Sequence, residues 1–304
     1  MQAASSPGDQ LRRLESVCLN DMAVLAGLGG WAGGRGALQL TLGRGVRRFA
    51  GAMAEFDLAV GQVGVARAAR QLARRYGAEI EAADAVRVPT TGPLLLVANH
   101  PGLLDSLAIY ATAPRPDLVA LSHPQPLLTL LPEMVRRHLM FVPDSGPRRA
   151  WSVRAMLDRL RRGGAIILFP AGHLEPDPIL AHGREPLDDW SPGLGALVRL
   201  AARRQIPLQV VPTAVRGALS ERIWRRFWPL IRLRRTRQTQ ADLTAVLQLI
   251  FPRLGSTTVR VGYGTPLDAE FLAATSLDAQ ALTDRIKSRL HALLSPEASD
   301  ESKD

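Results

Sequence analysis

His100 and Asp105 are five residues apart, between a short apolar run that ends at Ala98 and the apolar helical pattern that follows. The sequence therefore places the imidazole at the C-terminal end of a strand and the carboxylate in the first turn of a helix, where α/β proteins hold their active sites. A carboxylate there can hold an imidazole by its Nδ1–H and leave Nε2 free as a general base. The free N–H groups of the helix N-terminus can support a developing oxyanion. The alternative for this spacing alone is a capping or packing histidine beside a favourable first-turn acid.

Two further apolar runs, 165–169 and 208–211, also end in polar loops, and the first loop reads FPAGHLEPD. Because the C-terminal ends of parallel strands share one edge of a sheet, we expect these loops to converge on His100. His173 and Glu175 would then lie at the rim of the site. There they could bind substrate hydroxyls or supply a second acid or base, and ordinary loop polarity is the alternative.

The elements that must position these side chains follow from hydrophobic periodicity. From about residue 86, short apolar runs alternate with helical patterns, which predicts an α/β fold with a largely parallel central sheet flanked by helices. Helices are expected over 151–162 and from the Ser-Pro start at 191–192 to about residue 204. Strands are expected at 94–98, 118–121, 165–169, 208–211 and 258–262.

An N-terminal helical segment is expected to precede this domain. Residues 11–85 are rich in Ala, Gly, Leu and Arg and poor in β-branched residues, which favours helices. Apolar residues recur at helical spacing from Val65 to Tyr76, which predicts an amphipathic helix that ends at Gly77. We therefore divide the chain into a helical segment at 1–85, with membrane association as one interpretation of its Gly-rich apolar part at 22–45, an α/β domain at 86–292 and an acidic flexible tail at 293–304.

The composition narrows the classes of function. The 304 residues carry a net charge of +10, and only Lys287 and Lys303 among the 38 basic residues are lysine. This balance predicts an anionic partner, which could be nucleic acid, a membrane surface or a phosphorylated substrate. The single cysteine, Cys18, excludes an internal disulfide and a cysteine-based zinc site. No His, Asp and Glu cluster has the spacing of metal ligands, so neither a metal nor a bound cofactor is expected.

Three motifs, taken together and in order, resemble the glycerolipid acyltransferase family, which includes the lysophosphatidic acid and glycerol-3-phosphate acyltransferases. NHPGLLD is similar to the NH-x4-D motif of that family, FPAGH to its FPEGT motif and VVPTAV to its VPVAI-like motif, and the resemblance covers about residues 86–265. It implies that His100 is a general base that deprotonates an acceptor hydroxyl, which then attacks the thioester of an acyl-CoA or acyl-carrier protein. It also implies that Asp105 orients His100. The absence of a G-x-S-x-G motif agrees with a reaction that needs no acyl-enzyme.

The resemblance further implies an acceptor site at FPAGH and at HLMFVPD (residues 138–144), which is similar to the family's second motif, G-x-x-F-[IV]-x-R, and the chain departs from the family at both. Ala171 replaces the family's Glu and His173 its Thr, and Asp144 stands where the family's second motif has a phosphate-binding Arg. The residues expected to contact substrate are Asn99, Phe169, Pro170, Ala171, Gly172, His173 and Glu175. Either the acceptor is not a phosphorylated glycerol, or nearby arginines replace the missing one. The candidates for that replacement, which could equally be solvated surface residues, are Arg136, Arg137, Arg148 and Arg149.

The expected function is thus an O-acyltransferase that acts on a lysophospholipid or a similar glycerolipid. The alternatives are an acyltransferase with a non-phosphorylated acceptor, such as an ornithine-type lipid, and a non-catalytic lipid- or thioester-binding protein.

A basic segment rich in aromatic residues lies outside these motifs. Residues 220–237 hold seven arginines and one glutamate. Arginine beside tryptophan and phenylalanine is typical of an interfacial membrane element. The side chains expected to contact the membrane are Trp224, Arg225, Arg226, Phe227 and Trp228. Nucleic-acid binding is the less favoured alternative, and a solvated arm is another. The longest uncharged runs are broken by prolines and the start of the chain lacks a secretory signal, so we expect a cytoplasmic protein, peripheral on the inner face of the membrane.

Overall fold

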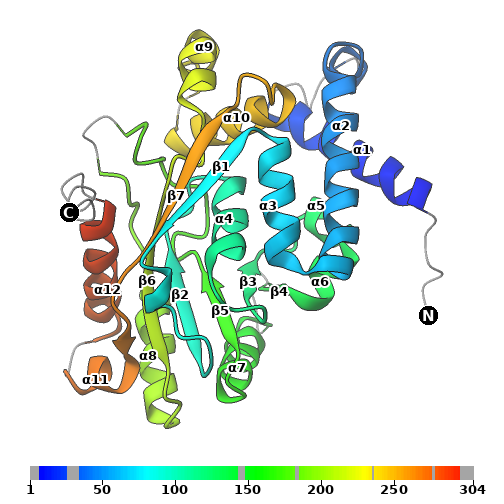
Figure 1. Cartoon of the computed structure of the whole chain (residues 1–304). Helices are drawn as coiled ribbons and strands as arrows, with labels where there is room; N and C mark the ends of the chain where they lie inside the picture. The colour runs from blue at the N-terminus through cyan, green and yellow to red at the C-terminus, as the bar shows by residue number, and fades with distance from the viewer. Residues whose placement is uncertain are drawn as a thin grey trace.

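A mostly parallel sheet runs through the centre of the molecule, with helices on both of its faces (Figure 1). The computed structural model describes residues 7–25, 34–142, 148–181, 185–234, 236–275 and 278–294. The strands in these ranges are β1 (Ala78–Ala83), β2 (Leu94–Ala98), β3 (Val119–Ser122), β4 (Leu139–Phe141), β5 (Ala165–Leu168), β6 (Gln209–Arg216), β7 (Thr257–Tyr263) and β8 (Leu267–Asp268). Their order across the sheet is β1-β7-β6-β2-β5-β3-β4, and β8 pairs with β6. The predicted fold class is confirmed.

Strand β2 lies at the centre of the sheet and sets the position of the catalytic candidates. It pairs in parallel with β5, with Leu94 opposite Ala165, and in parallel with β6, with Ala98 opposite Thr213. All of its residues are buried, as expected for a parallel strand that is covered on both faces. The C-terminal ends of β2 and β5 therefore lie side by side, while β6 runs past Thr213 to Arg216 rather than ending at 211 as expected. The antiparallel pairs of β6 with β7 and β8 are the exceptions to the parallel arrangement described here.

Two hydrophobic layers sandwich the sheet, because successive β2 side chains point to opposite faces. Leu96 packs into the layer formed with the N-terminal helices and α4, and Leu95 packs into the layer formed with α7, α8 and α12. The helices of the described ranges are α1 (Pro7–Leu25), α2 (Gly34–Val63), α3 (Val65–Arg75), α4 (Leu103–Thr112), α5 (Pro126–Thr129), α6 (Pro132–Arg137), α7 (Arg148–Arg161), α8 (Gly193–Arg203), α9 (Glu221–Ile231), α10 (Arg237–Ile250), α11 (Ala269–Ala274) and α12 (Ala279–Leu294), with a short 3-10 helix at Ala85–Arg87.

The N-terminal part is not helical throughout, in contrast to the expectation for residues 11–85. The amphipathic helix α3 ends at Arg75, and Gly77 then adopts a φ of 68° that turns the chain into β1. The sequence of β1, AEIEAA, is poor in strand-forming residues, and the strand exists because it pairs along its whole length with β7. Part of the Gly-rich segment at 22–45 and nearly all of the acidic tail at 293–304 lie outside the described residues.

Helices α9 and α10 stand over the edge of the sheet at which β2 and β5 end (Figure 1). Helix α9 begins shortly after β6 and packs against α10 through Ile223, Ile231, Leu243 and Leu247. The C-terminal end of α10 packs against α2. Ile250 of α10 lies so close to Gly45 of α2 that a Cβ on Gly45 would be 2.9 Å from the Cγ2 atom of Ile250. Among the described helices, none has the length and apolar composition needed to cross a membrane.

Candidate active site

His100 and Asp105 form a hydrogen-bonded pair at the junction between β2 and α4. The His100 Nδ1 atom lies 2.8 Å from Asp105 Oδ2, and the same carboxylate oxygen accepts the Gly102 backbone N–H at 2.8 Å. Ser106 donates both its backbone N–H and its hydroxyl to the other oxygen, Oδ1. Asp105 has no exposed surface. A buried carboxylate held by this many donors fixes the imidazole in the tautomer with the proton on Nδ1.

The ring of His100 lies at the wall of an apolar cavity. It stacks on Phe169 from the end of β5, with 4.3 Å between the ring centroids and 24° between the planes. The side chain of His100 is 25% exposed, and within the described ranges its Nε2 has no hydrogen-bond partner. The cavity has a volume of 340 Å³, and its apolar walls include Leu121, Val153, Met156, Leu194 and Leu197. A basic nitrogen therefore faces a space of the size and character of a small-molecule site.

The electrostatic surroundings of His100 favour its protonated form. Burial lowers the pKa of the imidazole, but the negative charges of Asp105, Glu175 and Asp242, together with the hydrogen bond to Asp105, outweigh this effect and raise the pKa above its ordinary value. A raised pKa means that His100 is a stronger base, because its protonated form is stabilised. This property suits the abstraction of a hydroxyl proton during catalysis.

Glu175 holds the loop after β5 against His100. Its Oε2 accepts the His100 backbone N–H at 3.1 Å, while its own N–H donates to the His100 carbonyl at 2.8 Å. Its Oε1 accepts the N–H groups of Asp188 and of the Trp190 indole, at 3.0 and 3.1 Å. Burial raises the pKa of this carboxyl, and the three hydrogen bonds act in the opposite direction. With no exposed surface, Glu175 supports His100 from behind, which corrects the expectation that it lies at the rim.

Two other buried polar side chains join the same loops. Asp177 accepts the backbone N–H groups of Gly217 and Leu219, at 3.0 and 2.9 Å, and so ties the loop after β5 to the turn after β6. The Asn99 amide exchanges two hydrogen bonds with the Val215 backbone, both 2.7 Å long, and ties the end of β2 to β6. Asn99 is completely buried, so it acts as a brace rather than as the substrate contact expected from the sequence.

The remaining predicted contacts of the FPAGH loop occupy different positions. Pro170 and Gly172 line the cavity beside His100, and Gly172 has a φ of 72° with open space where a side chain would be. Ala171 packs into the hydrophobic layer on the α8 side of the sheet. His173 is half-buried, and its Nε2 lies 2.9 Å from Asp188 Oδ2.

A carboxylate that the sequence analysis did not identify also faces the site. Asp242 lies on α10, half-buried, with no hydrogen-bond or ion-pair partner among the residues that the structure describes. Burial raises its pKa, while the charges of His100 and His173 act in the opposite direction, which places it within electrostatic range of both rings. No local motif marks Asp242, because it reaches the site only through the packing of α10.

The arginines predicted to replace the missing phosphate contact do not lie together at the cavity. Arg136 and Arg137 both pair with Glu133 on α6 and line neither the cavity beside His100 nor any other described here. Arg148 and Arg149 stand in the first turn of α7, and their side chains lie outside the described part of the chain, as does Asp144. No arginine or lysine lines the cavity beside His100 in the part of the molecule that the structure describes.

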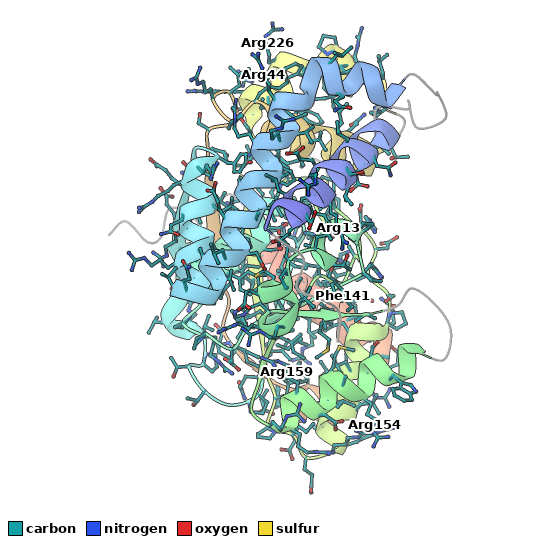
Figure 2. All side chains as sticks on the ribbon, turned by 90° about the vertical axis from the view of Figure 1, so that its right-hand side faces the viewer. Arg13, Arg44, Phe141, Arg154, Arg159 and Arg226 are labelled. Atoms are coloured by element: carbon teal, nitrogen blue, oxygen red, sulfur yellow. The ribbon has the colours of Figure 1, made fainter. Side chains whose placement is uncertain are left out.

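Helix α9 presents a basic and aromatic outer face. Ile223 and Ile231 are buried, while Arg225, Arg226 and Trp228 are exposed, and Trp224 and Phe227 are half-buried against α10 and its C-terminal turn. The ring centroids of Trp224 and Trp228 lie 5.1 Å apart. Figure 2 shows Arg226 at the same end of the molecule as Arg44 of α2, which is the end where α9 stands over the sheet. Exposed apolar side chains accompany the arginines there, among them Leu230 and Leu233.

The other histidines have structural environments. His138 is buried, and its Nδ1 lies 2.9 Å from the Leu118 carbonyl oxygen. His291 pairs with Glu185 at 3.3 Å, and His123 lies at the cavity wall with its Nδ1 3.2 Å from the Val142 carbonyl oxygen. His182 lies outside the described residues. Within the described ranges, no group of three or more His, Cys, Asp or Glu residues is placed to hold a metal ion.

Comparison with known proteins adds one finding. No protein-family model matches the chain, and no curated protein sequence matches it significantly. The solved structures that resemble the fold include the crystal structure of the 1-acyl-sn-glycerophosphate (LPA) acyltransferase PlsC from Thermotoga maritima. The alignment covers 93% of this chain and 96% of that one, with a TM-score of 0.46 and 13% sequence identity.

Proposed function

We propose that the protein is an acyltransferase that moves a fatty acyl group from a thioester to the hydroxyl of a lipid acceptor. The observation that carries this proposal is the His100–Asp105 pair, in which Nδ1 is held by a buried carboxylate and Nε2 is free at the wall of an apolar cavity. The resemblance of NHPGLLD, FPAGH and VVPTAV to the motifs of the glycerolipid acyltransferases supports the same reaction.

In the proposed reaction, the acceptor oxygen attacks the carbonyl carbon of the thioester while its proton passes to His100 Nε2. The carbon–sulfur bond then breaks, and the leaving thiolate takes up the proton from the imidazolium. Asp105 stabilises the positive charge that His100 carries between these steps. The apolar walls of the 340 Å³ cavity suit the acyl chain of the donor, because they remove its methylene groups from water. No covalent acyl-enzyme is needed.

We propose that the acceptor does not carry its phosphate next to the reacting hydroxyl. Asp105, Glu175 and Asp242 all act electrostatically on His100, and no arginine or lysine lines the cavity in the described part of the chain. A phosphate close to Nε2 would therefore be repelled by the negative charge of these carboxylates. A neutral or ammonium-bearing headgroup, as in the ornithine-type lipids considered from the sequence, avoids this repulsion.

We also propose that the protein binds the surface of an anionic membrane through α9. The exposed Arg222, Arg225 and Arg226 face the solvent beside Trp228 and Leu230. Each basic residue near an anionic bilayer contributes about 1 kcal/mol, and the aromatic rings suit headgroup depth. Because α9 stands over the strand ends, this orientation brings the candidate active site toward the lipid.

The proposal is tested with purified protein, acyl-CoA and acyl-carrier protein donors, and a panel of lysolipids with anionic, zwitterionic and cationic headgroups. Thiol release and product mass report the transfer. We expect His100→Ala to abolish transfer without lowering thermal stability. The matched control is His291→Ala, on α12 and outside both cavities, which should retain the wild-type rate. Transfer by His100→Ala at the wild-type rate would exclude His100 as the base.

A further inference from the structure

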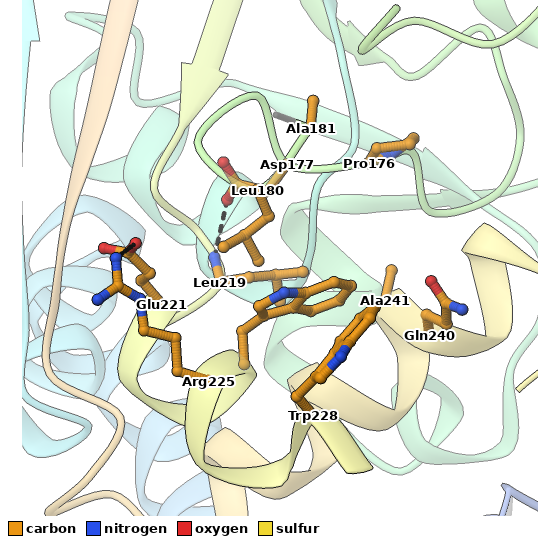
Figure 3. A pocket seen from close by; sticks show the side chains of 11 residues that line it. Pro176, Asp177, Leu180, Ala181, Leu219, Glu221, Arg225, Trp228, Gln240 and Ala241 are labelled. Carbon is orange, nitrogen blue, oxygen red and sulfur yellow. Dashed lines mark hydrogen bonds and ion pairs between the residues drawn. The ribbon is translucent and has the colours of Figure 1, made fainter. Parts of the chain in front are cut away.

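A second cavity, which shares no lining residue with the cavity at His100, lies near the turn that follows His100. It has a volume of 520 Å³ and lies between the loop after β5, helix α9 and helix α10 (Figure 3). Its wall is mostly apolar, and only the Glu221–Arg225 pair, Gln240 and the buried Asp177 interrupt it. The apolar lining consists of Pro176, Leu180, Ala181, Leu219, Trp224, Trp228 and Ala241.

The inner wall of this cavity touches the turn that carries the catalytic pair. Leu219 packs against the turn, since a Cβ at Gly102 would lie 3.2 Å from Leu219 Cδ2, and Gly102 itself donates a hydrogen bond to Asp105. On the second side, Pro176 directly follows Glu175, whose N–H donates to the His100 carbonyl at 2.8 Å. In α10, the lining residue Ala241 is followed directly by Asp242, whose charge acts on His100.

The outer wall belongs to the basic and aromatic face of α9. Trp228, 41% exposed, lies across from Leu180 and Leu219 and beside Gln240 and Ala241 (Figure 3). Arg225 pairs with Glu221 at 2.6 Å at the same place and is 76% exposed. The cavity therefore runs from a surface with arginine and tryptophan, which is complementary to anionic lipid, toward the His100 turn.

We propose that this cavity binds the hydrocarbon tail of the acceptor lipid. The tail enters beside Trp228 from the membrane surface, and its headgroup hydroxyl reaches His100 from the α10 side, while the acyl chain of the donor occupies the cavity stacked behind Phe169. A histidine that lines one apolar cavity, and whose following turn contacts the wall of the other, suits the transfer of an acyl chain to a lipid that already carries a hydrocarbon tail. The assignment of the tail to an acceptor rests on the proposed acyl transfer.

Tail binding is measured directly by tryptophan quenching. The probe is a phosphate-free lysolipid, a 1-monoacylglycerol with a mid-chain brominated tail, added as monomers below its critical aggregation concentration, because bromine quenches indoles that it touches. We expect saturable quenching in the wild type and a smaller amplitude at unchanged Kd in Trp228→Phe, which retains the aromatic wall. The butanoyl analogue with the same headgroup should fail to displace the probe. Equal displacement by this analogue would show headgroup binding and overturn the proposal.

Filling the cavity provides the second measurement. Ala241→Phe should raise the Kd of the brominated probe by at least about tenfold. This factor already results if the added ring keeps two methylene groups of the probe's tail from being buried in the cavity. The matched control is Val246→Phe, half-buried on the same helix and outside both cavities, which should leave the Kd unchanged. Gln240→Phe, at the half-buried mouth, serves as a second filling variant if Ala241→Phe does not fold. An unchanged Kd in a folded filling variant would overturn the proposal.

A brominated acyl-CoA separates the two substrates. If Ala241→Phe weakens the binding of acyl-CoA and spares the lysolipid, the cavity belongs to the donor and the proposal is wrong. His100-dependent transfer in the wild type is measured in parallel. Its absence, with saturable quenching by the lysolipid retained, would refute the proposed transfer but uphold a lipid-tail site. Transfer with no saturable quenching would refute the tail site alone.

Discussion

Replacing Asp105 by Asn should lower both the rate of the reaction and the pKa of His100. The carboxylate accepts four hydrogen bonds, from His100 Nδ1, the Gly102 N–H and the N–H and hydroxyl of Ser106. The amide of Asn has a single acceptor oxygen, so its NH2 group must face one of these donor pairs. If the NH2 faces Nδ1, the imidazole must carry its proton on Nε2 and can no longer act as a base. In both orientations the negative charge beside the ring is lost.

The expected loss follows from the contribution of a positioned base, about 10²–10⁴ in rate, which is about 3–5 kcal/mol of transition-state stabilisation. The pH dependence has a definite sign. Activity needs neutral His100, and Asp105 contributes to raising the pKa of this residue, so the wild-type rate should rise with pH through a midpoint above about 6.5. In Asp105→Asn, burial dominates, and the midpoint should move to lower pH.

The pH dependence of folding stability compares the wild type with Asp105→Asn without any substrate. Because the folded-state pKa of His100 is raised, the His100–Asp105 pair stabilises the wild type fully below the unfolded-state pKa of about 6.5 and loses this contribution as pH rises through the folded-state pKa. The free-energy difference between the wild type and Asp105→Asn should therefore be largest at low pH. The control is Ser106→Ala, which removes a hydroxyl donor but leaves the charge. An unmoved pH midpoint in Asp105→Asn would refute Asp105 as the group that sets the pKa of His100.

Three further predictions concern the supports of the site. Glu175→Gln replaces a carboxylate that accepts three hydrogen bonds with an amide that leaves at least one buried N–H unpaired. The free energy of unfolding in urea should therefore fall by about 1–3 kcal/mol. An unfolding curve with the wild-type midpoint and the wild-type slope would contradict this. Gly195→Ala would place a Cβ atom on the Ala279 carbonyl oxygen, where α8 meets α12. Calorimetry should show that the free energy of unfolding falls by about 1–3 kcal/mol. An unchanged Tm would mean that the two helices can move apart without loss of stability. Asp242→Asn removes a charge that faces His100, so in steady-state kinetics the KM should fall more for phosphate-bearing acceptors than for neutral ones; equal effects on both classes would show that Asp242 does not influence acceptor choice.

The contact between His100 and Asp105 could be predicted because its geometry is local. His100 and Asp105 lie on either side of one strand-to-helix junction, and the apolar run LLLVA identifies the strand. The neighbouring ends of β2 and β5 followed from parallel pairing alone, whereas the expected end of the third strand at 211 was wrong, because β6 continues to Arg216. For His100 and Asp105, the position along a single strand or helix was enough to predict the position in the folded protein.

The roles of the surrounding acids could not be predicted, because they depend on contacts between distant segments. Glu175 looked like a polar loop residue, and only the folding of Trp190 over it makes it a buried acceptor. Asp177 shares no sequence pattern with the turn at 217–219, forty residues away, which it binds. Asp242 belongs to an unremarkable helix, and it comes within electrostatic range of His100 only through the tertiary placement of α10.

The distribution of charge resolves an apparent conflict in the sequence. A net charge of +10 predicts an anionic partner, yet the groups that act electrostatically on His100 are carboxylates. The two charges operate in different places. The arginines of α9 are exposed and act through solvent, where charges are screened over about 8 Å at physiological ionic strength. Asp105 and Glu175 are fully buried, where screening is weak. In the proposed function, the basic charge would attract a membrane of anionic lipids, and the buried carboxylates would disfavour an acceptor whose reacting end carries a phosphate.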